Sequence, residues 1–177
     1  MSDLFTYEYS VAQKIEGKWV FKKIGMIFLY IAFVIFWFVF GFVTKLFPVM
    51  ALIPLTLWIL VFITWRYVKV EYEYSIISGL FTLSNVYGNR SRKKVVEFKI
   101  KDCCLIAPLK DSEEKIASYA PEKVYSGRSS VSSRDTYVAL VDIDGKKTAV
   151  YFEATEKALK ICQFYNASAT TVTKTTY

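Results

Sequence analysis

Two long stretches in the first part of the chain carry no charged residue. Ile24–Val43 and Val49–Trp65 are almost entirely apolar. As α-helices they would extend over about 30 Å and about 26 Å, compared with roughly 30 Å for the hydrocarbon core of a bilayer. Pro54 is expected to kink or loosen the second helix. The pattern predicts a two-helix transmembrane hairpin within residues 24–66, joined by the short link Thr44–Pro48.

The composition agrees with this prediction. Hydrophobic residues make up 54% of the 177 residues and aromatic residues 18%, and the excess is concentrated in the two stretches. Such segments are typical of a membrane protein. The alternative is a signal peptide followed by a soluble core helix. It is disfavoured because Ile24–Val43 is too long for the apolar region of a signal peptide and no small-residue cleavage site follows it.

Charges on either side of the predicted hairpin indicate its orientation. Four lysines precede it, Arg66 and Lys69 follow it, and the link holds Lys45 alone. Lysine and arginine accumulate on the cytoplasmic side of membrane proteins, so both termini are expected in the cytoplasm and the hairpin in the inner (plasma) membrane. The residues expected to anchor it at the membrane interface are Lys18, Trp19, Lys22, Lys23, Trp65, Arg66 and Lys69.

Residues 1–23 are predicted to form an amphipathic N-terminal segment. Leu4, Tyr7, Val11 and Ile15 recur at helical spacing. The segment is consistent with a helix that lies on the inner leaflet or against the soluble domain, and equally with an irregular lead-in. The pattern alone does not choose between these alternatives.

From Tyr67 onward the apolar period changes from that of a helix to that of a strand. In Val68–Ile76 hydrophobic and polar residues alternate, which is typical of a half-buried antiparallel strand. Ser78-Gly79 is a turn signal, and Leu80–Tyr87 is the expected partner strand of a hairpin. Further strands are expected at Lys93–Ile100, Cys103–Ala107, Thr136–Ile143 and Lys147–Phe152, with turns at Gly88-Asn89 and Asp144-Gly145.

The rest of the C-terminal half does not show strand alternation. Lys110–Asp135 is rich in serine and charge and is expected to be a long mobile connection, with room for a helical turn at Ser112–Tyr119. Residues 166–177 are expected to form a disordered polar tail. Between them, Thr155 is expected to cap a closing helix whose apolar stripe consists of Ala158, Ile161, Cys162 and Tyr165.

The order of these elements resembles the bacterial pleckstrin-homology-like (PH-like) domain, in the form that follows a hydrophobic hairpin in small membrane proteins. The resemblance is carried by Val68–Cys103 (VKVEYEYSIISGLFTLSNVYGNRSRKKVVEFKIKDC), by VDIDGKKTAVYF and by TEKALKICQFYN. It implies a mostly-β (α+β) cytoplasmic domain over residues 67–165, with a partly open barrel of about seven antiparallel strands closed by a C-terminal helix. It also implies a membrane-proximal interaction or scaffold module.

The region around the second predicted turn carries much of the positive charge of a chain whose net charge is +7. Its cationic residues are Arg90, Arg92, Lys93, Lys94, Lys99 and Lys101, opposed by Glu97. Anionic lipid of the inner leaflet attracts each nearby cation with about 1 kcal/mol, so these residues are candidates for binding lipid headgroups or a protein partner. The alternative is a solvated hairpin tip whose charges keep an exposed edge soluble. Nucleic acid is not an expected partner, because no recognition motif with stacking aromatic residues is present.

Few residues are suited to catalysis or metal binding. The chain has no histidine, which excludes Ser-His-Asp and Cys-His catalysis and histidine metal ligation. Its glycines form no phosphate-binding loop pattern. The adjacent Cys103 and Cys104 and the helical Cys162 are expected to be buried thiols, without a disulfide or a zinc ion. Neither an enzyme nor a cofactor or metal site is expected, and the uncharged spans disfavour a transporter.

These patterns lead to one functional expectation and one alternative. The expectation is a membrane-anchored PH-like binding or scaffold module at the cytoplasmic face of a bacterial inner membrane, with its basic turn near anionic lipid headgroups. The alternative is a structural or accessory subunit of a larger membrane assembly, formed with a membrane-protein partner or with further copies of the chain.

Overall fold

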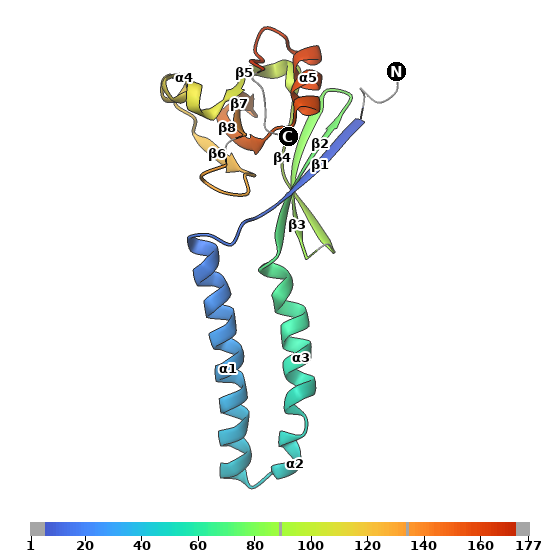
Figure 1. Ribbon diagram of the computed structural model, residues 1–177, viewed down its shortest axis with the longest axis vertical. Helices are drawn as coiled ribbons and strands as arrows, with labels where there is room; N and C mark the ends of the chain where they lie inside the picture. The colour runs from blue at the N-terminus through green and yellow to red at the C-terminus, as the bar shows by residue number, and fades with distance from the viewer. Residues whose placement is uncertain (1–5, 89, 134, 173–177) are drawn as a thin grey trace.

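Two apolar helical segments extend side by side from a domain built on two β-sheets (Figure 1). The computed structural model describes residues 6–88, 90–133 and 135–172. The first segment is helix α1, Lys18–Thr44. The second segment consists of α2 (Phe47–Met50), α3 (Ile53–Thr64) and the short 3-10 helix η2 (Trp65–Tyr67).

Both segments are long and apolar enough to cross a membrane. Most of their side chains lie on the surface, whereas those of a core helix in a soluble protein would be buried. The link between them is Lys45-Leu46, in which Lys45 adopts a left-handed conformation with φ 60°. The expected irregularity near Pro54 is confirmed, because helical structure is interrupted between Met50 and Ile53 and Pro54 lies in the first turn of α3.

The N-terminal segment contains a β-strand, so neither a helix nor an irregular lead-in was the right expectation for it. Strand β1 (Thr6–Ala12) pairs antiparallel with β2 (Val70–Ile77), and Ala12 lies opposite Glu71. Tyr7, Tyr9 and Val11 pack against the core while the residues between them are exposed. The helical spacing of Tyr7 and Val11 is thus also an even spacing, which fits one face of a strand. Leu4 lies outside the described residues.

Sheet A contains the strands that flank the helical segments. Its order is β1-β2-β3-β4, with β3 at Leu80–Tyr87 and β4 at Ser91–Lys99. The expected alternation of β2 is confirmed, because one face is buried and the other is half-buried. Ser78 and Gly79 both have positive φ, 51° and 80°, as a tight two-residue hairpin turn requires.

Sheet B has the order β5-β7-β8-β6. Its strands are β5 (Cys103–Pro108), β6 (Lys123–Ser126), β7 (Thr136–Ile143) and β8 (Lys146–Glu153). The described residues therefore contain eight strands in two separate sheets, rather than about seven in one partly open barrel. The expectation of antiparallel pairing throughout is also wrong, because β6 pairs with β8 in parallel.

The serine-rich region 110–135 is structured over most of its length, and the expectation of a mobile connection is wrong. The helical turn is confirmed as α4 (Glu113–Tyr119), which follows the 3-10 helix η4 (Leu109–Asp111). After β6, the backbone N–H and the hydroxyl of Ser129 both donate to Oε1 of buried Glu153, each at 2.6 Å. The hydroxyl of Tyr74 donates to the carbonyl of Gly127. Serine here satisfies buried polar groups instead of facing solvent.

The core lies between the two sheets and is closed by helix α5 (Glu156–Tyr165). Its buried side chains come from β2, β3 and β4, from β7 and β8, and from α5. The expected cap is confirmed, since Oγ1 of Thr155 accepts a hydrogen bond from the N–H of Ala158 at 3.2 Å. The stripe is confirmed as well: Ala158, Ile161 and Cys162 are buried. A smaller apolar cluster joins the other face of sheet B to α4.

The start of the predicted disordered tail is ordered. Nδ2 of Asn166 donates to the carbonyls of Ile100 and Cys103, at 3.0 and 2.9 Å. Backbone hydrogen bonds from Ile106 to Ala169 and from Thr171 to Ile106 then attach the chain to β5. The prediction missed this because the attachment depends on backbone groups and one amide, not on an apolar pattern. Residues 173–177 lie outside the described residues.

Candidate functional site

The six basic residues of the predicted turn are spread along β4 rather than gathered at one point. Arg90 precedes the strand at the end nearest the helices, while Lys99 ends it and Lys101 follows in the 3-10 helix η3 (Ile100–Asp102). A strand of this length extends over roughly 25–30 Å. Arg90 at one end of β4 therefore cannot contact the same headgroup or small ligand as Lys99 and Lys101 at the other end.

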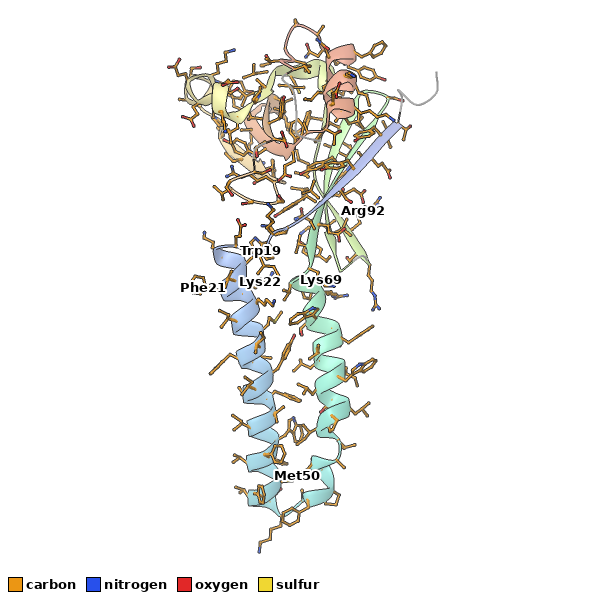
Figure 2. The ribbon with its side chains drawn as sticks, viewed as in Figure 1. Trp19, Phe21, Lys22, Met50, Lys69 and Arg92 are labelled. Atoms are coloured by element: carbon orange, nitrogen blue, oxygen red, sulfur yellow. The ribbon has the colours of Figure 1, made fainter. Side chains whose placement is uncertain are left out.

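Two of the six cations already have carboxylate partners. Nη2 of Arg92 lies 2.7 Å from Oε2 of Glu73, and Nζ of Lys94 lies 3.2 Å from Oε1 of Glu97. Hydrogen bonds from Lys94 and from a neighbouring threonine hydroxyl lower the pKa of Glu97. Lys93 is exposed and, by strand alternation, lies on the opposite face of the sheet from Arg92. Arg92 lies on sheet A above the helix ends (Figure 2).

Lys99 and Lys101 lie at the end of the domain that is far from the helices. Together with the Ser78-Gly79 turn and Tyr165 they line a pocket of 440 Å³. The β2–β3 turn that forms this pocket is at the opposite end of sheet A from α3 (Figure 1). These two lysines are therefore separate from any site that the helices help to form.

The turn between β3 and β4 is docked on the end of the second helical segment. The N–H of Gly88 donates to the carbonyl of Lys69 at 2.9 Å. Gly88 has φ +56°, and a Cβ there would lie 2.8 Å from Cβ of Arg66. The rings of Tyr67 and Tyr87 are 6.0 Å apart. This close approach needs glycine, and it fixes the position of the residues that follow the turn.

The docked turn encloses a pocket of 350 Å³ against the helix, which we call the junction pocket. Its walls include the rings of Trp58, Phe62 and Trp65 and the cations Arg66, Lys69 and Arg90. The guanidinium carbon of Arg90 lies 4.4 Å from the centroid of the Phe62 ring. Such a cation–π contact holds a charge beside an apolar surface.

Arg66 is half-buried in this pocket and only partly satisfied. Its Nη2 donates to the hydroxyl of Tyr67 at 2.9 Å, and its guanidinium stacks on the same ring. Its Nε is buried and has no hydrogen-bond partner among the described residues. The junction pocket thus combines an aromatic wall with three cations, and one of these cations, Arg66, has a buried Nε without a partner in the described structure.

The three cations of the junction pocket were assigned to two separate groups from the sequence. Arg66 and Lys69 were expected to be interface anchors, and Arg90 was part of the basic turn. A two-residue turn at Ser78-Gly79 pairs Ile77 with Leu80. Counting back along both strands places Lys69 opposite Gly88, which is the contact observed. Hairpin register was therefore the signal that could have brought them together.

The residues of α1 that were predicted to be interface anchors lie at the same end of the hairpin. Figure 2 shows Trp19, Lys22 and Lys69 where the helices meet the domain. Nζ of Lys22 is 4.7 Å from the Trp19 ring centroid, and Trp19 also packs against the domain core. Lys18 is exposed and Lys23 half-buried. Both helical segments thus carry cations at their domain-facing ends.

The three cysteines differ in exposure. Cys103 and Cys162 are buried, as expected, but Cys104 is exposed because β5 points it away from the core. Burial raises the pKa of Cys162 to about 12, and it raises the pKa of Cys103 as well. Across the described residues, no group of three or more cysteine, aspartate or glutamate side chains is placed to hold a metal ion.

Comparison with known proteins places the chain in a family. The family described as Bacterial PH-like domain (DUF6106) matches residues 2–171, which include β1, both helical segments and both sheets. No curated protein and no solved structure matches the chain. Because the match extends over nearly the whole sequence, the helices and the domain are parts of one family unit. The chain belongs to the bacterial PH-like domain family.

Proposed function

We propose that the protein is a non-catalytic binding or scaffold module that is anchored in the bacterial inner membrane by its helical hairpin. The observation that carries the proposal is the pairing of β1 with β2, because these strands immediately precede and follow the two apolar segments. Both segments must therefore leave the membrane on the same side, and the domain lies at that surface. PH-like domains are generally non-catalytic and often bind lipids or proteins.

The domain lies on the cytoplasmic side in this proposal. Lys18, Lys22, Arg66 and Lys69 are at the domain-facing ends of the helical segments, and the opposite end carries Lys45. Lysine and arginine are retained in the cytoplasm during insertion. The same cations would contact anionic headgroups, each with about 1 kcal/mol.

A second candidate function is that of an accessory subunit in a larger membrane assembly. It is favoured by a run of aromatic rings on α1, where Phe36, Trp37 and Phe40 contact one another at centroid distances of 5.7 to 6.2 Å. Phe36 and Phe40 are exposed to the surroundings of the helix. A partner helix could pack on this face, and a stoichiometric partner would then be retained in mild detergent.

The side of the membrane can be tested with a thiol that the chain already contains. Cys104 is exposed in the domain, whereas the link between the helices contains no cysteine. A membrane-impermeant maleimide should label Cys104 in inverted vesicles and not in spheroplasts. A Lys45→Cys, Cys104→Ser variant should show the opposite pattern. Labelling of wild-type Cys104 in intact spheroplasts would reject the cytoplasmic location, and complete release of the chain by alkaline carbonate would reject membrane anchoring.

A further inference from the structure

We propose that the junction pocket binds one anionic phospholipid molecule, with its phosphate among Arg66, Lys69 and Arg90 and its acyl chains along Phe62 and Trp58. This inference rests on the proposed function, because it requires α3 to lie in a bilayer. It differs from a general attraction to the leaflet, because it assigns one lipid to one place in the fold.

The charge of the pocket selects an anion. Its lining includes three cations and no carboxylate. By contrast, Arg92 and Lys94 on the same sheet are held by glutamates. No salt bridge in the described part of the chain involves Arg66, Lys69 or Arg90. An anion in the pocket would therefore meet charges that no acidic side chain neutralises.

An unpaired donor indicates which kind of anion fits. Nε of Arg66 is already removed from water without a hydrogen-bond partner among the described residues, while its Nη2 is bound to Tyr67. Leaving a buried donor unpaired is costly, and a small shift of the guanidinium towards a phosphate in the pocket would let this donor find an acceptor. A phosphate offers several acceptor oxygens and suits the fork of a guanidinium.

The apolar part of the pocket distinguishes a lipid from free phosphate. Phe62 lies one helical turn, roughly 6 Å, below Arg66 towards the centre of the apolar segment, and Trp58 lies a further turn below. The rings of Trp58 and Phe62 stack at 5.4 Å and are both exposed. Cations above and aromatic rings below match the order of headgroup and acyl chains in one leaflet.

Two contacts hold the walls of the pocket in place. Gly88 presses the β3–β4 turn against Arg66, and the Arg90 guanidinium is held over the Phe62 ring. A volume of 350 Å³ accommodates a glycerophosphate headgroup, while the acyl chains would continue along the exposed face of α3. Charged side chains within membrane segments usually have a partner, and the phosphate would provide one for these cations.

The test uses the full-length chain in a neutral detergent. Native mass spectrometry would follow titration with dioleoylphosphatidylglycerol, with dioleoylphosphatidylcholine as the zwitterionic control and inorganic phosphate as a competitor. One phosphatidylglycerol per chain is expected, with weaker binding of phosphatidylcholine. Arg90→Gln and Lys69→Gln should each lower the affinity about fivefold. Arg92→Gln and Lys101→Gln remove the same charge elsewhere and should change it less than twofold.

Several results would overturn the lipid site. Equal losses in all four variants would indicate diffuse attraction, equal binding of the two lipids would exclude headgroup recognition, and displacement by millimolar phosphate would assign the pocket to a free anion. Carbonate extraction of membranes separates this failure from that of the proposed function. A chain that stays in the membrane without lipid selectivity rejects the lipid site alone, whereas a chain that is released rejects the anchor as well.

Discussion

The hydroxyl oxygen of Tyr30 lies 2.6 Å from the hydroxyl oxygen of Thr64 and joins α1 to α3. Thr64 also donates to the carbonyl of Leu60 in its own helix, at 2.6 Å. Since the single threonine proton is used there, Tyr30 is the donor between the helices. A polar contact between two otherwise apolar segments fixes how one helix is placed against the other.

Tyr30→Phe is expected to destabilise the helix pair by about 1 kcal/mol, and a double-mutant cycle with Thr64→Val should give a coupling energy of roughly 0.6 kcal/mol. Unfolding in mixed detergent micelles would measure both. Thr56→Val is the matched control, because Oγ1 of Thr56 bonds only to carbonyls of its own helical segment in the described structure. Coupling between Tyr30 and Thr56 as large as that with Thr64 would contradict this assignment.

Gly88→Ala is expected to destabilise the domain by about 2–3 kcal/mol. The new methyl group would combine a left-handed backbone with a contact of 2.8 Å to Arg66. Gly145→Ala is the control, because Gly145 also has positive φ, +73°, but a methyl group added there would meet nothing within 4 Å. That substitution should cost only the left-handed backbone conformation, about 1 kcal/mol. Urea denaturation followed by circular dichroism would compare them, and equal losses would mean that the turn is not docked on the helix.

A soluble form of the domain should require β1. Removing it would expose the edge of β2 and the ring of Tyr74, which stacks on Tyr9 at 5.9 Å. A fragment that begins at residue 67 is therefore expected to aggregate. The N–H of Gln13 donates to the carbonyl of Val70 at 2.9 Å, so a short glycine–serine linker of about four residues can join them and replace the helices.

Size-exclusion chromatography and thermal unfolding would compare the linked chain with the fragment. The linked chain should be monomeric and should unfold cooperatively. A fragment from residue 67 that is equally monomeric and equally stable would show that β1 contributes little to the domain.

Stability is expected to fall at alkaline pH. Burial raises the pKa of Cys162 from 9.0 to about 12, and burial also raises the pKa of Tyr74. A group whose pKa is raised in the folded state binds its proton more tightly there than in the unfolded chain. It therefore contributes stability that is complete below the unfolded pKa and is lost as pH rises towards the folded pKa. For Cys162 the loss lies between about pH 9 and 12.

Cys162→Ala should lower stability at pH 7 and flatten its decline above pH 9. Urea midpoints at pH 7, 9 and 10.5 would show this. Cys104→Ala changes an exposed thiol and should leave the slope unchanged. Identical slopes for wild type and Cys162→Ala would contradict the role of the buried thiol.

Elements specified by neighbouring residues could be predicted from the sequence. The strands Leu80–Tyr87 and Thr136–Ile143 were found at their observed bounds, because each adjoins a two-residue turn, Ser78-Gly79 or Asp144-Gly145. Thr155 as helix cap was found for the same reason. Alternation, turn residues and caps act over a few positions, so a local pattern contains them.

Elements that depend on distant partners could not be predicted in this way. β1 pairs with a strand that follows the whole helical hairpin, and β6 pairs in parallel with β8, from which β7 separates it in the sequence. Neither has a turn signal at its pairing point. The junction pocket is intermediate, since its cations were named individually but their convergence depends on the register of β2 and β3.

The pairing of β1 with β2 also constrains how the protein can be made. During synthesis β1 emerges first, and its partner follows only after the entire hairpin, which at ordinary translation speed is a delay of several seconds. Sheet A is complete only when the ribosome has delivered both apolar segments and the three strands that follow them. A chain whose synthesis stops before Val70 would keep β1 as an unmatched strand with two tyrosines, which proteases and chaperones can recognise.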